Sequence, residues 1–374
     1  MAIPTNARPW MIYGANGYTG ELIAREAVAR GLRPVLAGRN ATAVGALALE
    51  LGLDSRAFAL DDPQEAQRGI AGTSAVLHCA GPFVRTSKPM VEACLAAGVH
   101  YLDITGEIGV FEPILGRRGE DARRAGIALL PGVGFDVVPS DCLAARLARE
   151  LPDATELILA FAADRGGISR GTLKTMIESL PGAGAVRRDG KIIPVKMAYD
   201  AREIDFGGAL GKRWAMTIPW GDVSTAFYST GIPNIRVYTG TPRGAIRRAR
   251  LFSPFLPLAG LKPVKRFLQR RIDRRDPGPS PQVLETARTY LWGQVKNAAG
   301  ATVTATLETP QGYRLTALSA VECARRAAAG QVPPGAWTPS KAFGADFVTE
   351  LPGVVAGEPV RSGGAAPPDS LAPA

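Results

Sequence analysis

The stretch WMIYGANGYTGELIAREAVARG, residues 10–31, places three glycines at intervals of three between an apolar run and a helical pattern. Trp10–Tyr13 has the composition of a short buried strand, and apolar residues recur at helical spacing after Gly20. Glycines in such a turn let the backbone approach a ligand closely, and the helix start offers unpaired N–H groups to a pyrophosphate. We therefore predict a dinucleotide-binding turn, with an ordinary strand-to-helix loop as the alternative. Its contact residues would be Gly14, Asn16, Gly17, Tyr18, Thr19 and Gly20.

The next strand pattern, RPVLAG, ends at Gly38, where a nicotinamide-binding fold contacts the adenine ribose. A carboxylate there would accept the 2′-hydroxyl of NAD, whereas the guanidinium of Arg39 can hold the 2′-phosphate of NADP through paired hydrogen bonds. The sequence thus favours NADP(H) as the cofactor, with Asn40 as a further contact. The alternative is a solvated Arg39 beside an Asn40 that only caps the next helix.

Four later apolar runs end in polar residues or glycine, at Asp62, Gly81, Glu107 and Asp136, and helical stretches separate them. Strands that alternate with helices predict an α/β fold with a doubly wound parallel sheet, whose ligands lie at the carboxyl ends of the strands. We assign residues 1–150 to this Rossmann-type dinucleotide-binding domain. By position along that edge, further cofactor contacts are expected from Asp61, Cys79, Ala80, Gly81 and Pro82.

After Leu151 the pattern changes to longer strand-like runs, among them Ser224–Thr230 and a pair joined by a turn at Asn297–Gly300. These runs predict a second, α+β domain on a mostly antiparallel sheet, spanning residues 151–337 and serving substrate binding or dimerisation. Residues 338–351 are predicted as a helix that returns to complete the Rossmann domain. The tail, residues 352–374, is rich in Pro, Gly and Ala and is expected to be disordered.

Together the motifs GANGYTG, AGRN, AGPF, YLDITGE and PGVGFDVVPSD resemble, in order and spacing, the saccharopine dehydrogenase-like NADP-binding oxidoreductases. The motifs GGISRGT and TPSKAFGADFVTEL make the chain look most like the branch called trans-acting enoyl reductases. The resemblance implies NADP(H), a Rossmann-type domain, and a place near the nicotinamide for Gly106, Glu107, Phe135 and Asp136. It supplies no proton donor by motif.

The formal charge of +10 is concentrated in one segment. Residues 243–276 hold eleven Lys or Arg but only two Asp, around an apolar stretch from Leu251 to Leu261. Such a segment suits the surface of an anionic membrane, and an acidic carrier protein would be attracted by the same charges. The plain alternative is a helical insert that covers the substrate pocket while its charges stay in water. No nucleic-acid partner is expected, because no binding motif or aromatic stacking pattern accompanies the charge.

Metal-ligating residues are few, since the chain has two histidines and its four cysteines form no CxxC pair. We therefore expect neither a metal site nor a disulfide framework. No apolar run reaches the roughly 18 residues of a membrane-spanning helix, and the N-terminus lacks the apolar core of a secretory signal. The expected location is the cytoplasm, and peripheral membrane contact through residues 243–276 is left open.

A reductase with bound NADPH and few histidines needs one acid, or water, to deliver a proton. Tyr101, Asp103, Glu107 and Asp136 are the candidates by location, and each could instead be structural. The leading hypothesis is reduction of an enoyl double bond on a hydrophobic lipid or polyketide-type acyl chain, free or carrier-bound. The alternatives are a saccharopine-type imine or amino-acid reductase and a non-catalytic NADP-binding scaffold at membranes. A homodimer is left open.

Overall fold

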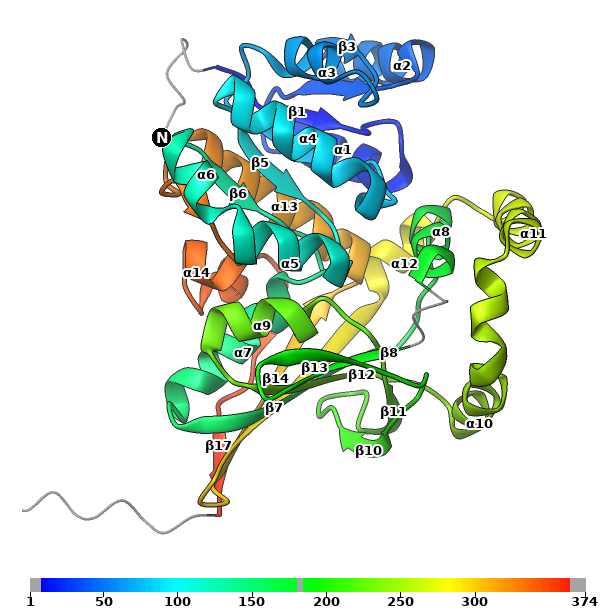
Figure 1. Cartoon of the computed structure of the whole chain (residues 1–374), viewed down its shortest axis with the longest axis vertical. Helices are drawn as coiled ribbons and strands as arrows, with labels where there is room; N and C mark the ends of the chain where they lie inside the picture. Colours follow the sequence, from blue (N-terminus) through cyan, green and yellow to red (C-terminus); the bar gives the residue numbers. More distant parts are fainter. Residues whose placement is uncertain (1–7, 180–183, 364–374) are drawn as a thin grey trace, which may run out of the picture.

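The computed structural model describes residues 8–179 and 184–363, which form two sheets and the helices around them (Figure 1). In this part of the chain the first sheet has seven parallel strands in the order β15-β6-β5-β4-β1-β2-β3. The predicted doubly wound parallel sheet is confirmed. Its strands are β1 (Met11–Tyr13), β2 (Val35–Gly38), β3 (Ser55–Ala57), β4 (Ala75–His78), β5 (His100–Asp103), β6 (Ala128–Leu130) and β15 (Gly335–Ala336).

Helices cover both faces of this sheet because its strands alternate apolar side chains between the faces. In β1, Ile12 belongs to the core beneath α1 and α13, whereas Met11 and Tyr13 belong to the core beneath α3 and α4. The helices of this layer are α1 (Tyr18–Ala29), α2 (Ala41–Leu51), α3 (Pro63–Ile70), α4 (Phe83–Ala97), α5 (Ile108–Arg117), α6 (Gly119–Arg124) and α13 (Gly312–Ala328).

The second sheet is mixed and mostly antiparallel, as predicted, with one parallel pairing between β12 and β7. The central strands β7, β13 and β14 are long, and the turn between β13 and β14 lies at the predicted position. The strands are β7 (Ala154–Ala163), β8 (Gly184–Arg188), β9 (Lys191–Val195), β10 (Ala201–Asp205), β11 (Lys212–Thr217), β12 (Asn234–Gly240), β13 (Arg288–Asn297), β14 (Thr302–Pro310), β16 (Val355–Ala356) and β17 (Val360–Ser362).

One hydrophobic core runs through both domains. Helices α7 (Val138–Glu150) and α9 (Asp222–Thr230) pack on each other, and α7 also packs on β13 and β14. Leu143 and Leu147 of α7 therefore share a core with Ile12 of the first sheet and Leu291 of the second. The two sheets therefore share buried apolar surface, which holds them together.

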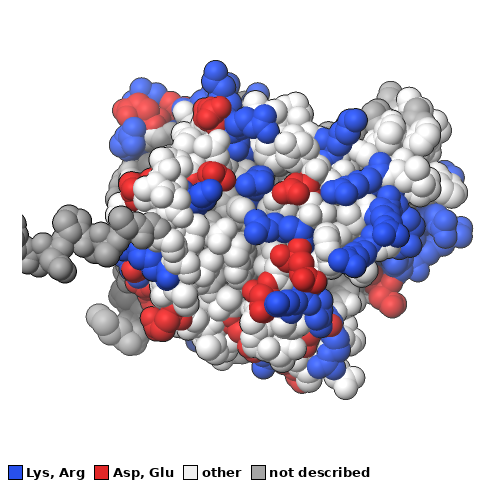
Figure 2. Space-filling model, turned by 90° about the horizontal axis from the view of Figure 1, so that it is seen from below, with Lys and Arg blue, Asp and Glu red and all other residues white. Residues whose placement is uncertain are grey.

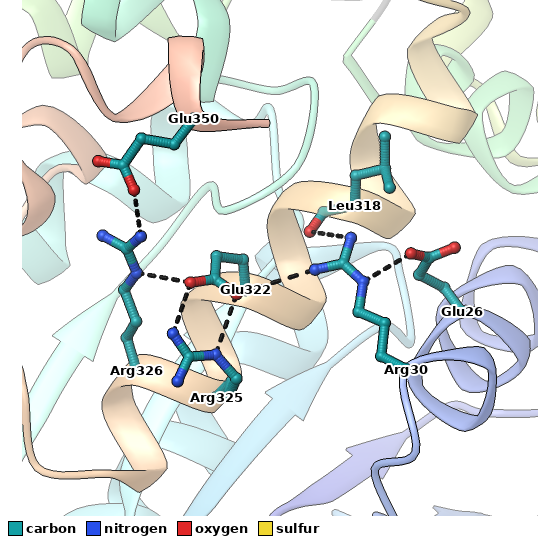
Figure 3. Close-up of polar contacts among 7 residues, drawn as sticks. All are labelled: Glu26, Arg30, Leu318, Glu322, Arg325, Arg326 and Glu350. Atoms are coloured by element: carbon teal, nitrogen blue, oxygen red, sulfur yellow. Dashed lines mark hydrogen bonds and ion pairs between the residues drawn. The ribbon is translucent and has the colours of Figure 1, made fainter. Parts of the chain in front are cut away.

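The boundary between the domains differs from the prediction, which gave residues 151–337 to the second domain. Helix α13 packs on α1 and on β4 and β5, and β15 adds to the edge of the first sheet beside β6. Polar contacts support this position. Glu322 of α13 pairs with Arg30, the residue that follows α1, and with Arg325 and Arg326 of its own helix, and Arg326 pairs in turn with Glu350 (Figure 3). The first domain is therefore completed by α13 and β15.

Three smaller predictions were wrong in the described ranges. Residues 338–351 form a short helix α14 (Pro339–Phe343) and a 3₁₀ turn η3 (Phe347–Glu350) that pack on α7, and Gly344 separates them. Residues 352–363 are not disordered, because β16 and β17 pair with β14, while residues 364–374 lie outside the described part. Ser224–Thr230 lies in helix α9, since its buried residues pack on α7 and outweigh its strand-like composition.

The basic segment forms a separate arm at the margin of the molecule (Figure 1). It consists of α10 (Arg243–Phe252), the 3₁₀ segment η2 (Ser253–Gly260) and α11 (Lys262–Asp273), and α11 packs on α8 (Arg170–Ser179). Helix α12 (Pro281–Thr286) then leads into β13. Within the described ranges no helix is both long enough and apolar enough to cross a bilayer.

Candidate active site

The glycine turn at the carboxyl end of β1 is packed too closely for side chains at two of its glycines. A Cβ on Gly14, whose φ is +84°, would lie 2.8 Å from the Ala80 nitrogen, and a Cβ on Gly20 would lie 2.3 Å from the Gly14 oxygen. The chain can therefore leave β1 and enter α1 within a few residues. The first-turn amides of α1 have no acceptor within the helix and are available to a pyrophosphate.

The Tyr18 side chain joins this turn to the second domain. Its hydroxyl donates to the Pro279 carbonyl oxygen at 2.8 Å, and its ring meets the Tyr313 ring edge-on at 5.3 Å between centroids. A Cβ on Gly278 would lie 2.4 Å from the Tyr18 ring. Because the side chain is committed to these contacts, the backbone amide is the group of Tyr18 that suits a phosphate.

The residues around the end of β2 include one guanidinium without a partner. Arg39 is exposed and forms no hydrogen bond or ion pair with residues 8–179 or 184–363. Asn40 caps α2, since its side-chain oxygen accepts from the Ala43 amide at 3.0 Å. Asn16 Oδ1 lies close to Gly38: a Cβ added to Gly38 would be 3.1 Å from this oxygen. Arg39 is thus free to bind a 2′-phosphate, whereas the side chain of Asn40 has a structural role.

A cavity of about 180 Å³ lies between the glycine turn and α8, where the strand order of the first sheet reverses. Ligands bind at such reversal points because the loops diverge there and leave a crevice. The first domain contributes Thr19, Cys79, Gly81, Pro82, Phe83, Ile104, Gly106 and Asp136. The start of α8 and the start of α13 contribute Ser169, Gly171, Thr172, Lys174, Thr175, Tyr313 and Thr316.

Asp136 is the carboxyl group in the wall of this cavity. Its Oδ1 is enclosed and has no hydrogen-bond partner in the part of the chain that the structure describes. A Cβ on Gly106 would lie 2.8 Å from Asp136 Oδ2, so only glycine at position 106 leaves room for the carboxyl group. Burial raises the pKa of Asp136 to about 8. At neutral pH the side chain is therefore mostly a neutral acid that can donate a proton.

Tyr101 and Asp103, two other predicted acids, lie in the interior and do not line the cavity. The Tyr101 hydroxyl donates to Asp103 at 2.6 Å, and Asp103 also accepts from the amides of Thr105 at 3.0 Å and Gly132 at 2.8 Å. Burial raises the pKa of Asp103 to about 6, although the hydrogen bonds from these donors act to lower it. The pair joins the ends of β5 and β6, which is a structural role.

Glu107, the fourth candidate acid, caps helix α4. Its two carboxylate oxygens accept from the amides of Phe83 at 2.8 Å and Val84 at 2.9 Å, while burial raises its pKa. These contacts hold the loop that carries Gly81 and Pro82 against the cavity. Glu107 therefore positions the cavity wall, and of the four candidates only Asp136 meets the cavity.

The remaining predicted cofactor contacts are divided between the cavity and its surroundings. Cys79 lines the cavity, and burial raises the pKa of its thiol, so the group stays protonated. Ala80 supports Gly14, and Asp61 is exposed beyond β3. The Phe135 ring packs edge-on against Phe161 at 5.6 Å between centroids, on the side of the second sheet. The roles of these residues toward the cofactor stay predictions.

The part of the cavity wall that α13 supplies was not predicted. The Tyr313 hydroxyl accepts from the Ser169 amide at 2.8 Å and lies 2.8 Å from Thr172 Oγ1, so it joins the start of α13 to the start of α8. Thr316 Oγ1 accepts from the Phe135 amide at 2.9 Å. The sequence signals a helix here, directly after a strand, but nothing in it places that helix on the first sheet.

Several ion pairs help to hold helix α8 over the cavity. Glu178 pairs with Arg85 of α4 at 3.1 Å and with Lys265 of the arm, and Lys174 pairs with Asp273 of the arm at 2.6 Å. Lys174 is the one cationic side chain among the described residues that line the cavity, and its charge is already matched. The cavity therefore offers no unmatched positive charge to a substrate carboxylate.

Comparison with known proteins gives matches in sequence and in fold. Residues 10–128 match the family model of the saccharopine dehydrogenase NADP binding domain. Two Mycobacterium tuberculosis proteins described as trans-acting enoyl reductases are 32% and 30% identical over 185 residues, which is 46% of this chain and 43% or 44% of theirs. A saccharopine dehydrogenase-like oxidoreductase of Arabidopsis thaliana is 32% identical over 148 residues, 35% of this chain and 32% of that protein. Each match thus spans less than half of the relative.

The fold is shared over a longer range than the sequence. The structure of apo saccharopine dehydrogenase (L-Glu forming) from Saccharomyces cerevisiae has a TM-score of 0.64 to this chain, and the match covers 95% of this chain and 100% of that one. At 12% identity this likeness concerns the fold alone. It includes both the parallel sheet and the mixed sheet, so the two-domain arrangement is common to both proteins.

Proposed function

We propose that the chain reduces an enoyl double bond of a hydrophobic acyl substrate. Its cofactor is NADP(H), as predicted, since residues 10–128 match the saccharopine dehydrogenase NADP binding domain. The observation that carries the proposal is Asp136, an acid held largely neutral in the wall of the cavity. Reduction of a carbon–carbon double bond needs a hydride at one carbon and a proton at the other. When bound, NADPH supplies the hydride.

The residues that would hold NADPH lie along the carboxyl edge of the first sheet. The free amides at the start of α1 and the glycine turn suit the pyrophosphate, because close backbone approach is possible there. The unpaired guanidinium of Arg39 suits the 2′-phosphate. Cys79, Gly81, Pro82 and Gly106 leave mostly backbone and small side chains at the cavity, where a flat nicotinamide ring fits.

Asp136 holds the proton that the substrate carbon takes up. A general acid works best when its pKa lies near the working pH, because it is then both protonated and ready to give the proton away. After donation, the carboxylate would be left with an enclosed Oδ1 that has no donor among the described residues, so it would readily regain a proton from water.

The cavity favours a neutral, apolar reacting group. Lys174, the one cationic side chain among the described residues that line it, is matched by Asp273, which disfavours the dicarboxylic substrate of a saccharopine-type reductase. Its volume of about 180 Å³ is below the roughly 300–1,000 Å³ of pockets that enclose a whole ligand. A long acyl chain would therefore continue outside, along an open groove of about 480 Å³ beside Ile168 and Leu173. The two mycobacterial relatives named as trans-acting enoyl reductases support an enoyl group as the reacting group.

The test is Asp136→Asn, an exchange of similar size that removes the acid. We expect NADPH binding to be retained and the rate of enoyl thioester reduction to fall at least about 100-fold, the range typical of a lost general acid.

In the native chain the rate should fall as the pH rises above about 8, because Asp136 then loses its proton. Asp54→Asn, the same change at an exposed site away from the cavity, is the matched control. A native-like rate in Asp136→Asn would refute the assignment, and turnover of imines alone would favour the saccharopine-type alternative.

A further inference from the structure

The arm, residues 243–276, has an inner side that is fixed to the body of the molecule. Ile246 and Ile272 are buried, and the Arg250 side chain donates to the Ala198 carbonyl oxygen at 3.0 Å. The Arg243 guanidinium lies over the Trp214 ring at 4.2 Å, a cation–π contact. These contacts, with the ion pairs to α8, define which side of the arm faces outward.

The outer side of the arm exposes an unusual number of large apolar side chains. Five within a stretch of seventeen residues are each more than half exposed to solvent, namely Leu251, Phe252, Phe255, Leu261 and Phe267. Single exposed apolar residues are normal on a protein surface, but a group of them with three aromatic rings marks an interaction surface.

The arm also carries positive charge that the molecule does not use internally. Seven exposed arginines have no ion pair or side-chain hydrogen bond with the described parts of the chain, namely Arg247, Arg248, Arg266, Arg270, Arg271, Arg274 and Arg275. Most arginines elsewhere, such as Arg25, Arg118 and Arg326, pair with carboxylates. The arginines of the arm are therefore available to an external anion.

Apolar and basic side chains alternate on the outward faces of the two helices. In α10, Arg247 and Leu251 are four residues apart, as are Arg248 and Phe252, so each pair lies on one side of the helix. In α11, Phe267 is flanked by arginines at positions 266, 270 and 271. Figure 2 shows the result as basic side chains gathered at the right of this face, the side on which Figure 1 places α10 and α11.

We propose that the outer side of the arm binds the surface of an anionic phospholipid bilayer. Helices that lie in a membrane interface combine apolar side chains, which enter the acyl boundary, with cations that bind lipid phosphates. An acidic protein would satisfy the seven arginines but gives no reason for five outward apolar side chains. A bilayer accommodates both.

The membrane would then lie next to the cavity. The arm is joined to α8 through Glu178 and Asp273, and α8 forms one wall of the cavity. The open groove beside Ile168 and Leu173 is bounded on its other side by Arg274 and Arg275. The membrane-binding surface is inferred from the side chains of the arm, so this proposal does not depend on the proposed reductase activity.

The experiment is co-sedimentation of the whole chain with vesicles of phosphatidylcholine alone or mixed with phosphatidylglycerol. We expect binding to the mixed vesicles only, weakened by salt. Arg266→Gln, Arg270→Gln and Arg271→Gln combined should weaken it on the order of 100-fold, because each cation near the surface contributes about fivefold. Phe252→Ser with Phe267→Ser should weaken it as well, and more clearly at high salt, where the apolar contribution remains.

A matched control removes the same charge elsewhere. Arg68→Gln, Arg117→Gln and Arg361→Gln combined alter three exposed arginines that have no ion pair within the described residues and lie outside the arm. This control should bind as the native chain does, and NADPH binding by every variant verifies the fold. Equal binding to both vesicle types, native-like binding by the triple arm variant, or binding to an acidic acyl carrier protein without vesicle binding would overturn the proposal.

Discussion

The two walls of the cavity are held by different kinds of interaction. At the glycine turn, backbone atoms pack directly on one another: Gly14 packs against Ala80, and Gly20 packs against Gly14. The opposite wall, α8, is held by ion pairs of part-exposed side chains and by the hydroxyl contacts of Tyr313. Close packing of backbone on backbone leaves no room for an added atom, whereas each surface ion pair contributes little to stability. We therefore expect the cofactor side to be rigid and intolerant of substitution, and the substrate side to be adjustable.

The largest effect should come from a single methyl group in the glycine turn. In Gly20→Ala the new Cβ would lie 2.3 Å from the Gly14 oxygen, so the turn must shift. NADPH affinity, measured by fluorescence titration, should fall at least about 100-fold, or the chain should fail to fold. Gly45→Ala, in a helix with no atom within 4 Å of the new Cβ, should bind normally and gain about 0.5–1 kcal/mol in stability. Equal behaviour of the two variants would refute the packing account.

A smaller effect on the same side concerns the choice of cofactor. Arg39→Asp should weaken NADPH relative to NADH by at least about tenfold, because a carboxylate repels the 2′-phosphate that the guanidinium attracts. Arg39→Ala should shift the ratio in the same direction but less. Dissociation constants for both nucleotides give the answer, and an unchanged ratio in both variants would remove Arg39 from the cofactor site.

On the α8 side we expect only a modest change. Glu178→Gln removes the charge that holds both Arg85 and Lys265, so α8 and the arm should separate more easily from the body. The KM for substrate should rise about three- to tenfold with little change in NADPH affinity, consistent with part-exposed ion pairs. Glu120→Gln, which breaks the exposed pair with Arg123, is the matched control. A loss of NADPH affinity as large as that of Gly20→Ala would contradict the comparison of the walls.

The smallest predicted effect is on stability and depends on pH. Burial alone would raise the pKa of Glu322, but hydrogen bonds from Arg325 and Arg326 outweigh it and lower the pKa below the usual 4.5. The unfolded chain therefore binds the proton more readily, so the stabilisation is complete above about pH 4.5 and is lost as the pH falls through the folded-state pKa. Glu322→Gln should lower the free energy of unfolding by about 1 kcal/mol at pH 7 and by less at acid pH. Urea denaturation at several pH values measures both; a pH-independent difference would contradict the assignment.

Much of the first domain could be predicted because glycine and strand patterns record local geometry. The turn from Gly14 to Gly20 and the parallel, doubly wound sheet follow from the glycine spacing and from the alternation of strands and helices. Helix α13 could not be assigned to the first sheet, because its position depends on contacts such as Glu322 with Arg30, nearly 300 residues apart in sequence. The strand predicted at Ser224–Thr230 is a helix because packing on α7 decides its structure.

The sequence predicted a group of candidate proton donors but did not show which one lines the cavity. Asp103, Glu107 and Asp136 all follow apolar runs and look alike in the sequence. In the structure only Asp136 of these three acids lines the cavity, and their hydrogen bonds differ. Asp103 accepts from Tyr101, Glu107 accepts from the α4 amides, and Asp136 Oδ1 has no partner within the described ranges. Such differences depend on the final positions of backbone donors, which no spacing rule gives.

The most direct measurement is a single-turnover reaction of the NADPH-bound protein with a long-chain enoyl thioester, followed by loss of NADPH fluorescence, for the native chain and Asp136→Asn. We expect the native chain to oxidise NADPH as it reduces the double bond, with a rate that falls above about pH 8. Asp136→Asn should bind NADPH equally well and react at least about 100-fold more slowly. Tight NADPH binding by the native chain without turnover would contradict the proposed reductase activity, and equal rates in the two proteins would contradict the role of Asp136 as the proton donor.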